Sequence, residues 1–358
     1  MNRVLLVLSA AAAVALGAGT AASADVAPHT TTSSSVAGVE IVPASWPEAV
    51  SDGYVAGAYS VHNESRGYVW HKGVFTDLGV LGGGDYTYAY SVNDSGEVVG
   101  DSGDFSTSLG VHAFLWRNGT LTGLDGLGGD SFANEINDKG LIIGVASTSS
   151  GASYAATWKD GKLTTLPGLS SGGSGDPTLV NEAGQVAGLS AAASGADHAV
   201  LWTNGKVVDL GIGEPIALND LGQVLVEANQ PSGQAYAYLW EHGKKIMLPA
   251  GVQANALNDK GQVVGTYGTA SDGFVWQNGK LTDLGAEQPV GINVRGQILA
   301  YTYDNGQFDS VVLDHGRTIT LTPTSGTSAT VAGISDSGLV AGTTEATSSA
   351  TAWQLPVG

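Results

Sequence analysis

The stretch HAFLWRNG, residues 112–119, decides how the whole chain folds, because it recurs along the sequence. Its tryptophan stands just before a short turn. The same position is filled in seven further copies, by Trp70, Trp158, Trp202, Trp240, Trp276, Leu313 and Trp353. Successive copies are 46, 42, 44, 38, 36, 37 and 40 residues apart, which gives a repeat of about 40 residues. The histidine of the opening stretch, His112, is replaced by other residue types in most copies, so we interpret it as scaffold.

A second motif accompanies the first, and its clearest form is INDKGLIIG at 136–144. Six other full copies lie at 92–100, 180–188, 218–226, 257–265, 292–300 and 334–342. A copy that is one residue shorter, VSDGYVAG, lies at 50–57. The chain therefore contains eight repeats.

Each repeat predicts four short strands and no helix. In the unit around residue 136, the segment 132–137 ends in the turn NDKG, and 141–147 is an apolar run typical of a strand covered on both faces. In the preceding unit, the segments 112–117 and 119–124 represent the third and fourth strands, joined by an Asn-Gly turn. Repeated four-stranded units of this length are typical of β-propeller blades. We predict an all-β propeller of about eight four-stranded blades, with seven as the alternative.

The two ends of the chain predict how the ring closes. The last repeat stops after its third strand, at TAWQL, so its fourth strand is missing. Near the N-terminus, GVEIVP at 38–43 is similar to a fourth strand such as GRTITL at 316–321. We expect the strand around Val39–Val42 to complete the last blade. An open solenoid would need no such borrowed strand.

The repeat also resembles a known family. HAFLWRNGTLTGLDGLGGDSFANEINDKGLIIG, at 112–144, is similar to the extracellular HAF repeat, and the resemblance extends from about residue 50 to the end. Later units depart from the pattern, since LGIGEPIALND has lost the Gly-Gly pair. The resemblance implies a secreted repeat protein and no settled activity. The Trp-Asp signature of WD-type propellers is absent.

The N-terminus and the composition indicate export. Residues 1–24 carry Arg3, an apolar run and the sequence ASA, which predict a secretory signal peptide rather than a membrane span. Residues 25–36 read as a Thr/Ser-rich linker, and 37–358 as one propeller domain. The sequence has no cysteine, and we expect a secreted, extracellular monomer without a membrane span. After Arg3 is removed, 13 cationic residues face 33 acidic ones, and this net charge of −20 argues against nucleic acid as a partner.

Loop lengths suggest where a ligand binds. Three consecutive connections between repeats have 14, 12 and 14 residues, counted from the last strand to the next turn motif, and the following three have 8, 9 and 8. Binding residues concentrate in such variable loops. The long-loop sector contains the binding residues that we predict: Asp85, Tyr86, Tyr88 and Asp130, with Asp176 nearby. The alternative is that these tyrosines pack between blades and the aspartates cap turns.

Motifs for catalysis or for a metal are absent from the sequence. It has no G-x-S-x-G, H-E-x-x-H or Walker loop, no zinc-type Cys/His cluster, and no calcium-loop spacing. Glu48 and Glu135 lie on predicted inner strands and leave a carboxylate pair open. We predict no metal or cofactor, and catalytic residues are unknown. The leading hypothesis is a secreted module that binds an extracellular glycan, peptide or other surface component. The alternatives are a propeller-type polysaccharide hydrolase or lyase, and a structural matrix protein.

Overall fold

The structure is a computed structural model that describes residues 33–104, 110–170, 174–229, 235–269, 271–304 and 307–356. Within these ranges the chain consists of strands and turns, with no helix. The predicted signal peptide and the first eight residues of the predicted linker lie outside the described residues.

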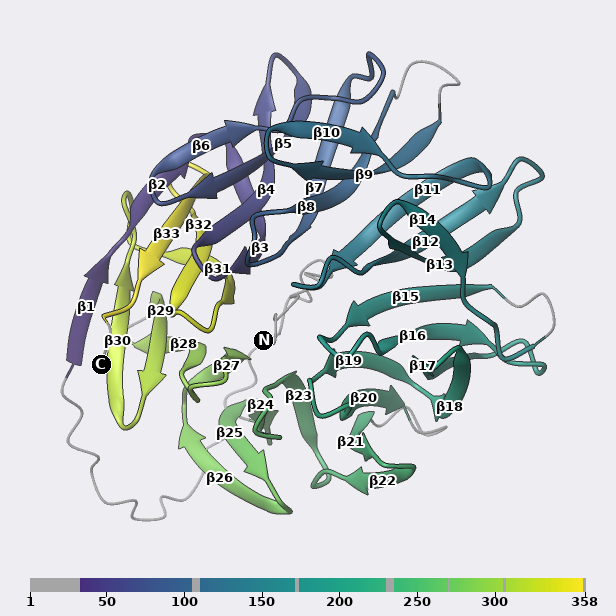
Figure 1. Cartoon of the computed structure of the whole chain (residues 1–358). Helices are drawn as coiled ribbons and strands as arrows, with labels where there is room; N and C mark the ends of the chain where they lie inside the picture. The colour runs from purple at the N-terminus through teal and green to yellow at the C-terminus, as the bar shows by residue number, and fades with distance from the viewer. Residues whose placement is uncertain are drawn as a thin grey trace.

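Eight antiparallel sheets form the blades of the propeller and are arranged around a central axis (Figure 1). Blade 1 comprises β3 (Ser45–Ser51), β4 (Tyr54–Val61), β5 (Glu64–His71) and β6 (Val74–Asp77). Blade 2 comprises β7 (Tyr86–Val92), β8 (Val98–Gly103), β9 (Val111–Arg117) and β10 (Thr120–Gly123). Blade 3 comprises β11 (Gly128–Ile136), β12 (Ile142–Thr148), β13 (Ser153–Lys159) and β14 (Lys162–Thr165). Blade 4 comprises β15 (Gly175–Val180), β16 (Val186–Ala191), β17 (Asp197–Thr203) and β18 (Lys206–Ile212).

The second half of the ring follows the same plan. Blade 5 comprises β19 (Glu214–Leu218), β20 (Val224–Asn229), β21 (Ala235–Glu241) and β22 (Lys244–Met247). Blade 6 comprises β23 (Val252–Leu257), β24 (Val263–Tyr267), β25 (Asp272–Gln277) and β26 (Lys280–Gly285). Blade 7 comprises β27 (Gln288–Ile292), β28 (Ile298–Asp304), β29 (Gln307–Asp314) and β30 (Arg317–Thr322). Blade 8 contains β31 (Ala329–Ile334), β32 (Leu339–Thr344) and β33 (Ser349–Gln354). The first strand of each blade contacts the first strand of the next, and β31 returns to β3, so the prediction of eight blades is confirmed.

The N-terminal segment completes the ring. Strand β2 (Val39–Val42) pairs antiparallel with β33, with Val39 opposite Ala352 and Glu40 opposite Thr351, and so supplies the missing fourth strand of blade 8. Strand β1 (Ser33–Ala37) adds a fifth, parallel strand to blade 7 along β30. Residues 33–36 therefore belong to a strand and not to the linker that we predicted there. The open edge of β30 offers hydrogen-bond partners, which outweigh the weak strand preference of three serines.

A β-bulge in every first strand explains the glycine that ends most copies of the turn motif. In blade 3 the pairing shifts between Ala133 and Glu135, which brings the backbone of β11 close to Gly144 on β12. A Cβ atom on Gly144 would lie 2.0 Å from the carbonyl oxygen of Phe132. The same approach occurs at Gly57, Gly100, Gly188, Gly265 and Gly342. The repeat thus keeps glycine where two backbones meet.

The turns between third and fourth strands have the left-handed geometry that the Asn-Gly pairs predict. Both residues of the turn have positive φ in each of these pairs, as in type I′ hairpins: Lys72–Gly73, Asn118–Gly119, Asp160–Gly161, Asn204–Gly205, His242–Gly243, Asn278–Gly279 and His315–Gly316. The tryptophan before the turn packs in the protein interior, and Trp158 and Trp353 are fully buried. Their indole N–H groups donate to backbone carbonyls of the preceding connections, at Asp125 and Thr322. His112 is exposed, and its interpretation as scaffold stays a prediction.

Buried asparagines of the turn motif link neighbouring blades. The Nδ2 of Asn219 donates to the carbonyl oxygen of Asn258 in the next blade at 3.0 Å, and its Oδ1 accepts from the backbone N–H of Gln223 in its own turn. Equivalent interblade bonds start from Asn93, Asn137, Asn181, Asn258 and Asn293, the last ending at Ser335. Six consecutive links of one kind therefore run from blade 2 to blade 8.

The borrowed strands give a first prediction. Deleting residues 25–43 removes β1 and β2 and leaves β30 and β33 with unpaired edges, so we expect the unfolding temperature to fall by at least about 5 °C. Deleting residues 25–32 alone, which removes no described strand, is the control. Equal melting temperatures for the two deletions, measured by circular dichroism, would contradict closure by these strands.

The asparagine links give a second prediction. Asn219→Ala removes the buried amide and leaves the Asn258 carbonyl without its donor, so we expect a loss of about 2–4 kcal/mol in the free energy of unfolding. Leu221→Ala, at an exposed position of the same turn, should change it by less than about 0.5 kcal/mol. Chemical denaturation of both variants measures the difference. Similar values for the two would show that the link contributes little.

Candidate functional site

The propeller presents two different faces. The turn face carries the short turns that follow the first and third strands, and the loop face carries the remaining connections. The sequence-predicted binding residues and a pocket between blades 4, 5 and 6 both lie on the loop face, but in different sectors.

The predicted tyrosines lie side by side on β7, the first strand of blade 2. The rings of Tyr86 and Tyr88 are 5.5 Å apart, centroid to centroid, and Tyr88 also stacks on Tyr90 at 6.3 Å. Tyr86 is only 4% exposed, whereas Tyr88 is half-buried and its hydroxyl lies 3.1 Å from Ser65 Oγ in blade 1. Tyr88 thus makes an interblade contact, as the packing alternative expects.

Of the two predicted aspartates, Asp130 caps a backbone group, whereas Asp85 pairs through its own backbone. Asp130 Oδ1 accepts from the backbone N–H of Val111 at 3.0 Å. Burial raises the pKa of Tyr86, and the charges of Asp101 and Asp130 raise it further. Asp85 begins the strand pairing through its own N–H, which donates to the Gly103 carbonyl. Tyr86, Tyr88 and Asp130 are therefore neighbours. That they bind a ligand stays a prediction.

One residue of this cluster was missed. Asp101, on β8 opposite Tyr88, is 3% exposed, and burial raises the pKa of its carboxyl. The hydroxyls of Tyr90 and Tyr86 donate to it. The sequence could have indicated Asp101. The tight turn after YTYAY makes the following segment, VVGDSG, its antiparallel partner, which places the aspartate opposite the tyrosines. The tyrosine cluster is organised around this buried carboxyl.

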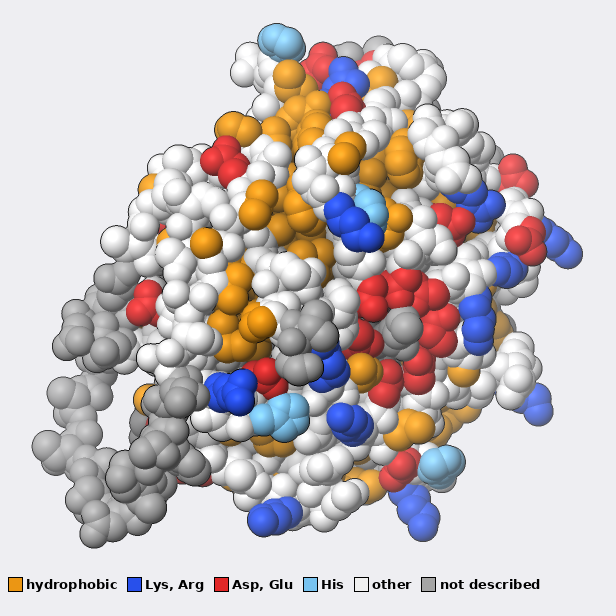
Figure 2. Space-filling view, turned by 60° about the vertical axis from the view of Figure 1, so that its left-hand side comes forward, with side chains coloured by type: hydrophobic (Ala, Val, Ile, Leu, Met, Phe, Trp, Pro, Cys, Tyr) orange, Lys and Arg blue, Asp and Glu red, His pale blue; other side chains and the backbone are white. Residues whose placement is uncertain are grey.

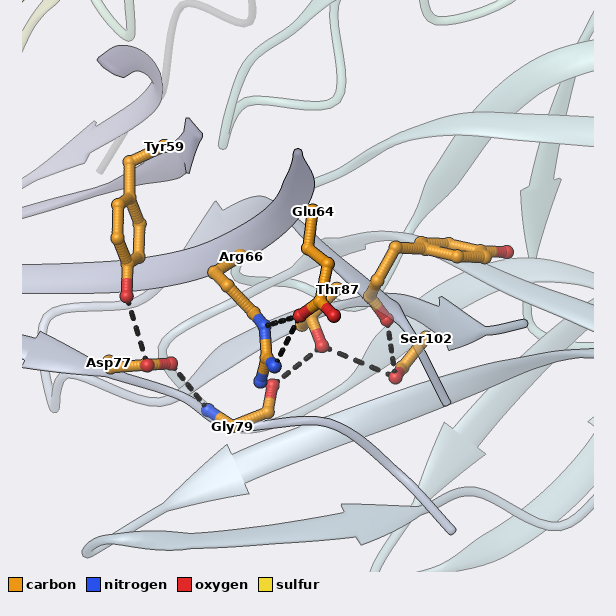
Figure 3. A network of polar contacts seen from close by, with 8 residues as sticks. Tyr59, Glu64, Arg66, Asp77, Gly79, Thr87 and Ser102 are labelled. Atoms are coloured by element: carbon orange, nitrogen blue, oxygen red, sulfur yellow. Dashed lines mark hydrogen bonds and ion pairs between the residues drawn. The ribbon is translucent and has the colours of Figure 1, made fainter. Parts of the chain in front are cut away.

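Hydrogen bonds hold the long connection between blades 1 and 2 in place (Figure 3). The Gly79 N–H donates to Asp77, whose carboxylate also accepts from the Tyr59 hydroxyl, and the Gly79 carbonyl accepts from Thr87 Oγ1. Ser102 Oγ accepts from Thr87 and from the Leu81 N–H. This long loop therefore packs onto its blades.

A pocket of about 840 Å³ opens between blades 4, 5 and 6, where the connections are short. A single residue, Gly213, separates β18 from β19, and four residues separate β22 from β23. We call this cavity the blade 4–6 pocket. Its polar lining consists of Asp197, Glu214, Glu227, Asn229, Gln253, Thr266, Tyr267 and Ser271. The lengths of the loops in the sequence did not predict this pocket. It lies where the connections are short, because a short connection does not cover the surface between blades.

Glycine at position 213 is required for the tight connection beside this pocket. Its φ is +143°, and a Cβ atom there would lie 2.7 Å from the Glu227 carbonyl oxygen. The next residue, Glu214, pairs directly opposite Glu227 on the neighbouring strand. Burial raises the pKa of Glu227, and the charge of Glu214 raises it further. The pocket is therefore acidic, and its described lining contains no Lys, Arg or His.

The two inner-strand glutamates singled out in the sequence occupy different blades. Glu135 is 3% exposed, and its carboxylate accepts from the backbone N–H of Val180 at 2.7 Å, so it links blades 3 and 4. Glu48 lies on the first strand of blade 1, and burial raises its pKa. Neither belongs to the described pocket.

A ring of carboxylates lies on the turn face, next to the asparagine links. The carboxylate of Asp220 accepts from the Glu182 N–H at 2.8 Å, and the Asp220 N–H donates to Asp259 at 2.7 Å. The same type of bond ends on Asp94, Asp138, Glu182 and Asp336, while Asp52 accepts from the Ser337 N–H and so joins blade 8 to blade 1. Figure 2 shows a dense patch of acidic side chains on the surface, as such a ring requires. Each of these carboxylates holds a backbone group of an adjacent blade.

The described residues offer neither a metal centre nor a membrane-spanning helix. They contain no group of three or more His, Cys, Asp or Glu side chains placed to hold a metal ion. No described helix is long and apolar enough to cross a membrane.

Comparison with known proteins supports the fold. No family model matches the chain, and no curated protein matches its sequence. Among solved structures, the β-propeller domain of the Trilobed protease from Pyrococcus furiosus, described as having an open velcro topology, is similar with a TM-score of 0.50 and 9% identity, over 76% of this chain and 95% of that one. An acylaminoacyl peptidase from Pyrococcus horikoshii (TM-score 0.46, 11% identity) aligns over 78% of this chain and 52% of its own. At these identities the likeness shows a propeller and says nothing of activity.

The carboxylate ring gives a third prediction. Burial, together with Asp52 and Asp259, raises the pKa of Asp336 to about 6. A carboxyl whose pKa is higher in the folded state favours folding when protonated, and that contribution is lost as pH rises through about 6. Asp336→Asn keeps an acceptor for the Val294 N–H but removes the charge. We expect this variant to melt at a higher temperature than the wild type at about pH 7.5, with a smaller difference at about pH 5.

The control is Asp125→Asn, whose side chain is exposed and lies outside the ring. It should shift the melting temperature little at either pH. A higher melting temperature for the wild type than for Asp336→Asn at the upper pH would show that the ionised carboxylate stabilises the ring.

Proposed function

We propose that the chain is an exported β-propeller of the extracellular HAF repeat type that acts as a binding module. Its ligand would be an extracellular peptide, glycan or other surface component. The predicted signal peptide and the resemblance of residues 112–144 support export, and the closed propeller supports an interaction role because it presents loops on a rigid scaffold.

The observation that carries the proposal is the blade 4–6 pocket. Its volume of about 840 Å³ lies within the range of pockets that hold small molecules or single side chains with their neighbours. Apolar residues such as Ile212 and Val252 line it alongside carboxylates, amides and a tyrosine. Such a mixture supplies contact area and directional hydrogen bonds together. We therefore assign binding to this pocket and keep the tyrosine cluster of blade 2 as the alternative location.

The proposal gives a fourth prediction. The mature chain, residues 25–358, is screened on glycan and peptide arrays, and the strongest binder is titrated against variants. Gln253→Trp fills the pocket from an exposed strand position, so we expect a loss of about tenfold or more in affinity, near 1.4 kcal/mol. His242→Ala on the turn face should leave the affinity unchanged.

Tyr88→Ala tests the alternative location. Loss of affinity with Tyr88→Ala and none with Gln253→Trp would move the binding site to the long-loop sector. Release of new reducing ends from a polysaccharide on the array would instead favour the hydrolase alternative.

A further inference from the structure

Two glutamates of the blade 4–6 pocket face each other across neighbouring strands. Glu214 on β19 and Glu227 on β20 are direct cross-strand partners. Side chains at such positions start about 4.5–5.5 Å apart, and like charges there destabilise a sheet. Both side chains line the pocket, so the place where their charges meet is open to a ligand.

The described surroundings do not neutralise this pair. No Lys, Arg or His is present among the described lining residues, and the pocket adds a third carboxylate, Asp197. Lys245 of blade 5 places its Nζ over the ring of Tyr238, 4.4 Å from the centroid, and is not part of the lining. The repulsion is therefore left for a ligand to relieve.

The uncharged lining suits the same type of ligand. Tyr267 presents an aromatic ring held by an edge contact with Phe274 and by Asp283, which accepts from its hydroxyl. Aromatic rings attract cations over their faces. The side-chain oxygens of Asn229 and Gln253 can accept hydrogen bonds from an ammonium or guanidinium group. The chain's net charge of −19 also favours the approach of positively charged partners.

We infer that the blade 4–6 pocket binds the positively charged side chain of a basic peptide segment, with Glu214 and Glu227 as its counter-charges. This inference rests on the proposed function and specifies its ligand class. The ammonium group of Lys or the guanidinium group of Arg would lie between the two carboxylates, and the apolar part of the side chain would contact Ile212 and Val252.

The test uses capped tri-lysine as the probe, with capped tri-alanine, capped tri-glutamate and cellotetraose for comparison. Isothermal titration of the mature chain should show saturable binding of tri-lysine, at least about tenfold tighter than that of the other three. The double variant Glu214→Gln with Glu227→Gln should lose about tenfold or more of this affinity. It should also melt at a temperature no lower than the wild type, because a like-charge pair has been removed.

A matched control separates the pocket from overall charge. Glu40→Gln with Asp125→Asn removes two exposed carboxylates elsewhere and changes the net charge equally. It should retain tri-lysine affinity within about twofold. Equal losses in both double variants, or no saturable binding of tri-lysine to the wild type, would overturn the inference.

The proposed function can survive that failure. If the ligand from the array screen loses affinity with Gln253→Trp but not with the glutamate double variant, the pocket remains the binding site and its ligand is not cationic. Binding of an amino sugar with the same dependence on Glu214 and Glu227 would assign the site to a glycan and overturn the peptide assignment.

Discussion

The buried asparagine amide of the turn motif is the interaction on which the ring depends. Its Oδ1 atom fixes the turn of its own blade, and its Nδ2 atom donates to the backbone of the next blade, as Asn219 does with Gln223 and Asn258. One side chain therefore couples local geometry to the angle between blades. Since six blades carry the same residue in the same place, the same angular step recurs and the chain curves into a closed ring.

The carboxylates that follow these asparagines in the sequence form a second set of hydrogen bonds between the same neighbouring blades. Asp220 holds a backbone group of the preceding blade and Asp259 holds one of Asp220's own blade. The ring is interrupted once, where Val294 stands in the place of an acidic residue and can only donate to Asp336. Repulsion within the ring opposes folding at neutral pH, and the backbone hydrogen bonds offset it. The acidic residues of the pocket differ, because Glu214 and Glu227 line a cavity and not a joint between turns.

The sequence predicts the architecture well, because each repeat contains the residues that set its length and its turns. The spacing of tryptophans gives the blade length, the Asn-Gly pairs give the hairpins, and the missing last strand identifies Val39–Val42 as its replacement. The extra strand over residues 33–37 was not foreseen, since its pairing depends on the free edge of β30 and not on its serines. The candidate pocket was also not foreseen. We expected the long loops to form the binding site, but the loop between blades 1 and 2 packs onto its blades through the hydrogen bond between Thr87 and Gly79. The pocket instead lies where the connections are short, as at Gly213.

The pairing of β1 and β2 dictates the order in which the molecule can be assembled. Residues 33–42 are synthesised well before their partners at 317–322 and 350–352. The ring cannot close until residues 350–352 have been synthesised, and closing it joins segments about 300 residues apart, a long-range contact of the kind that slows folding. Until then the early segment remains without its partners.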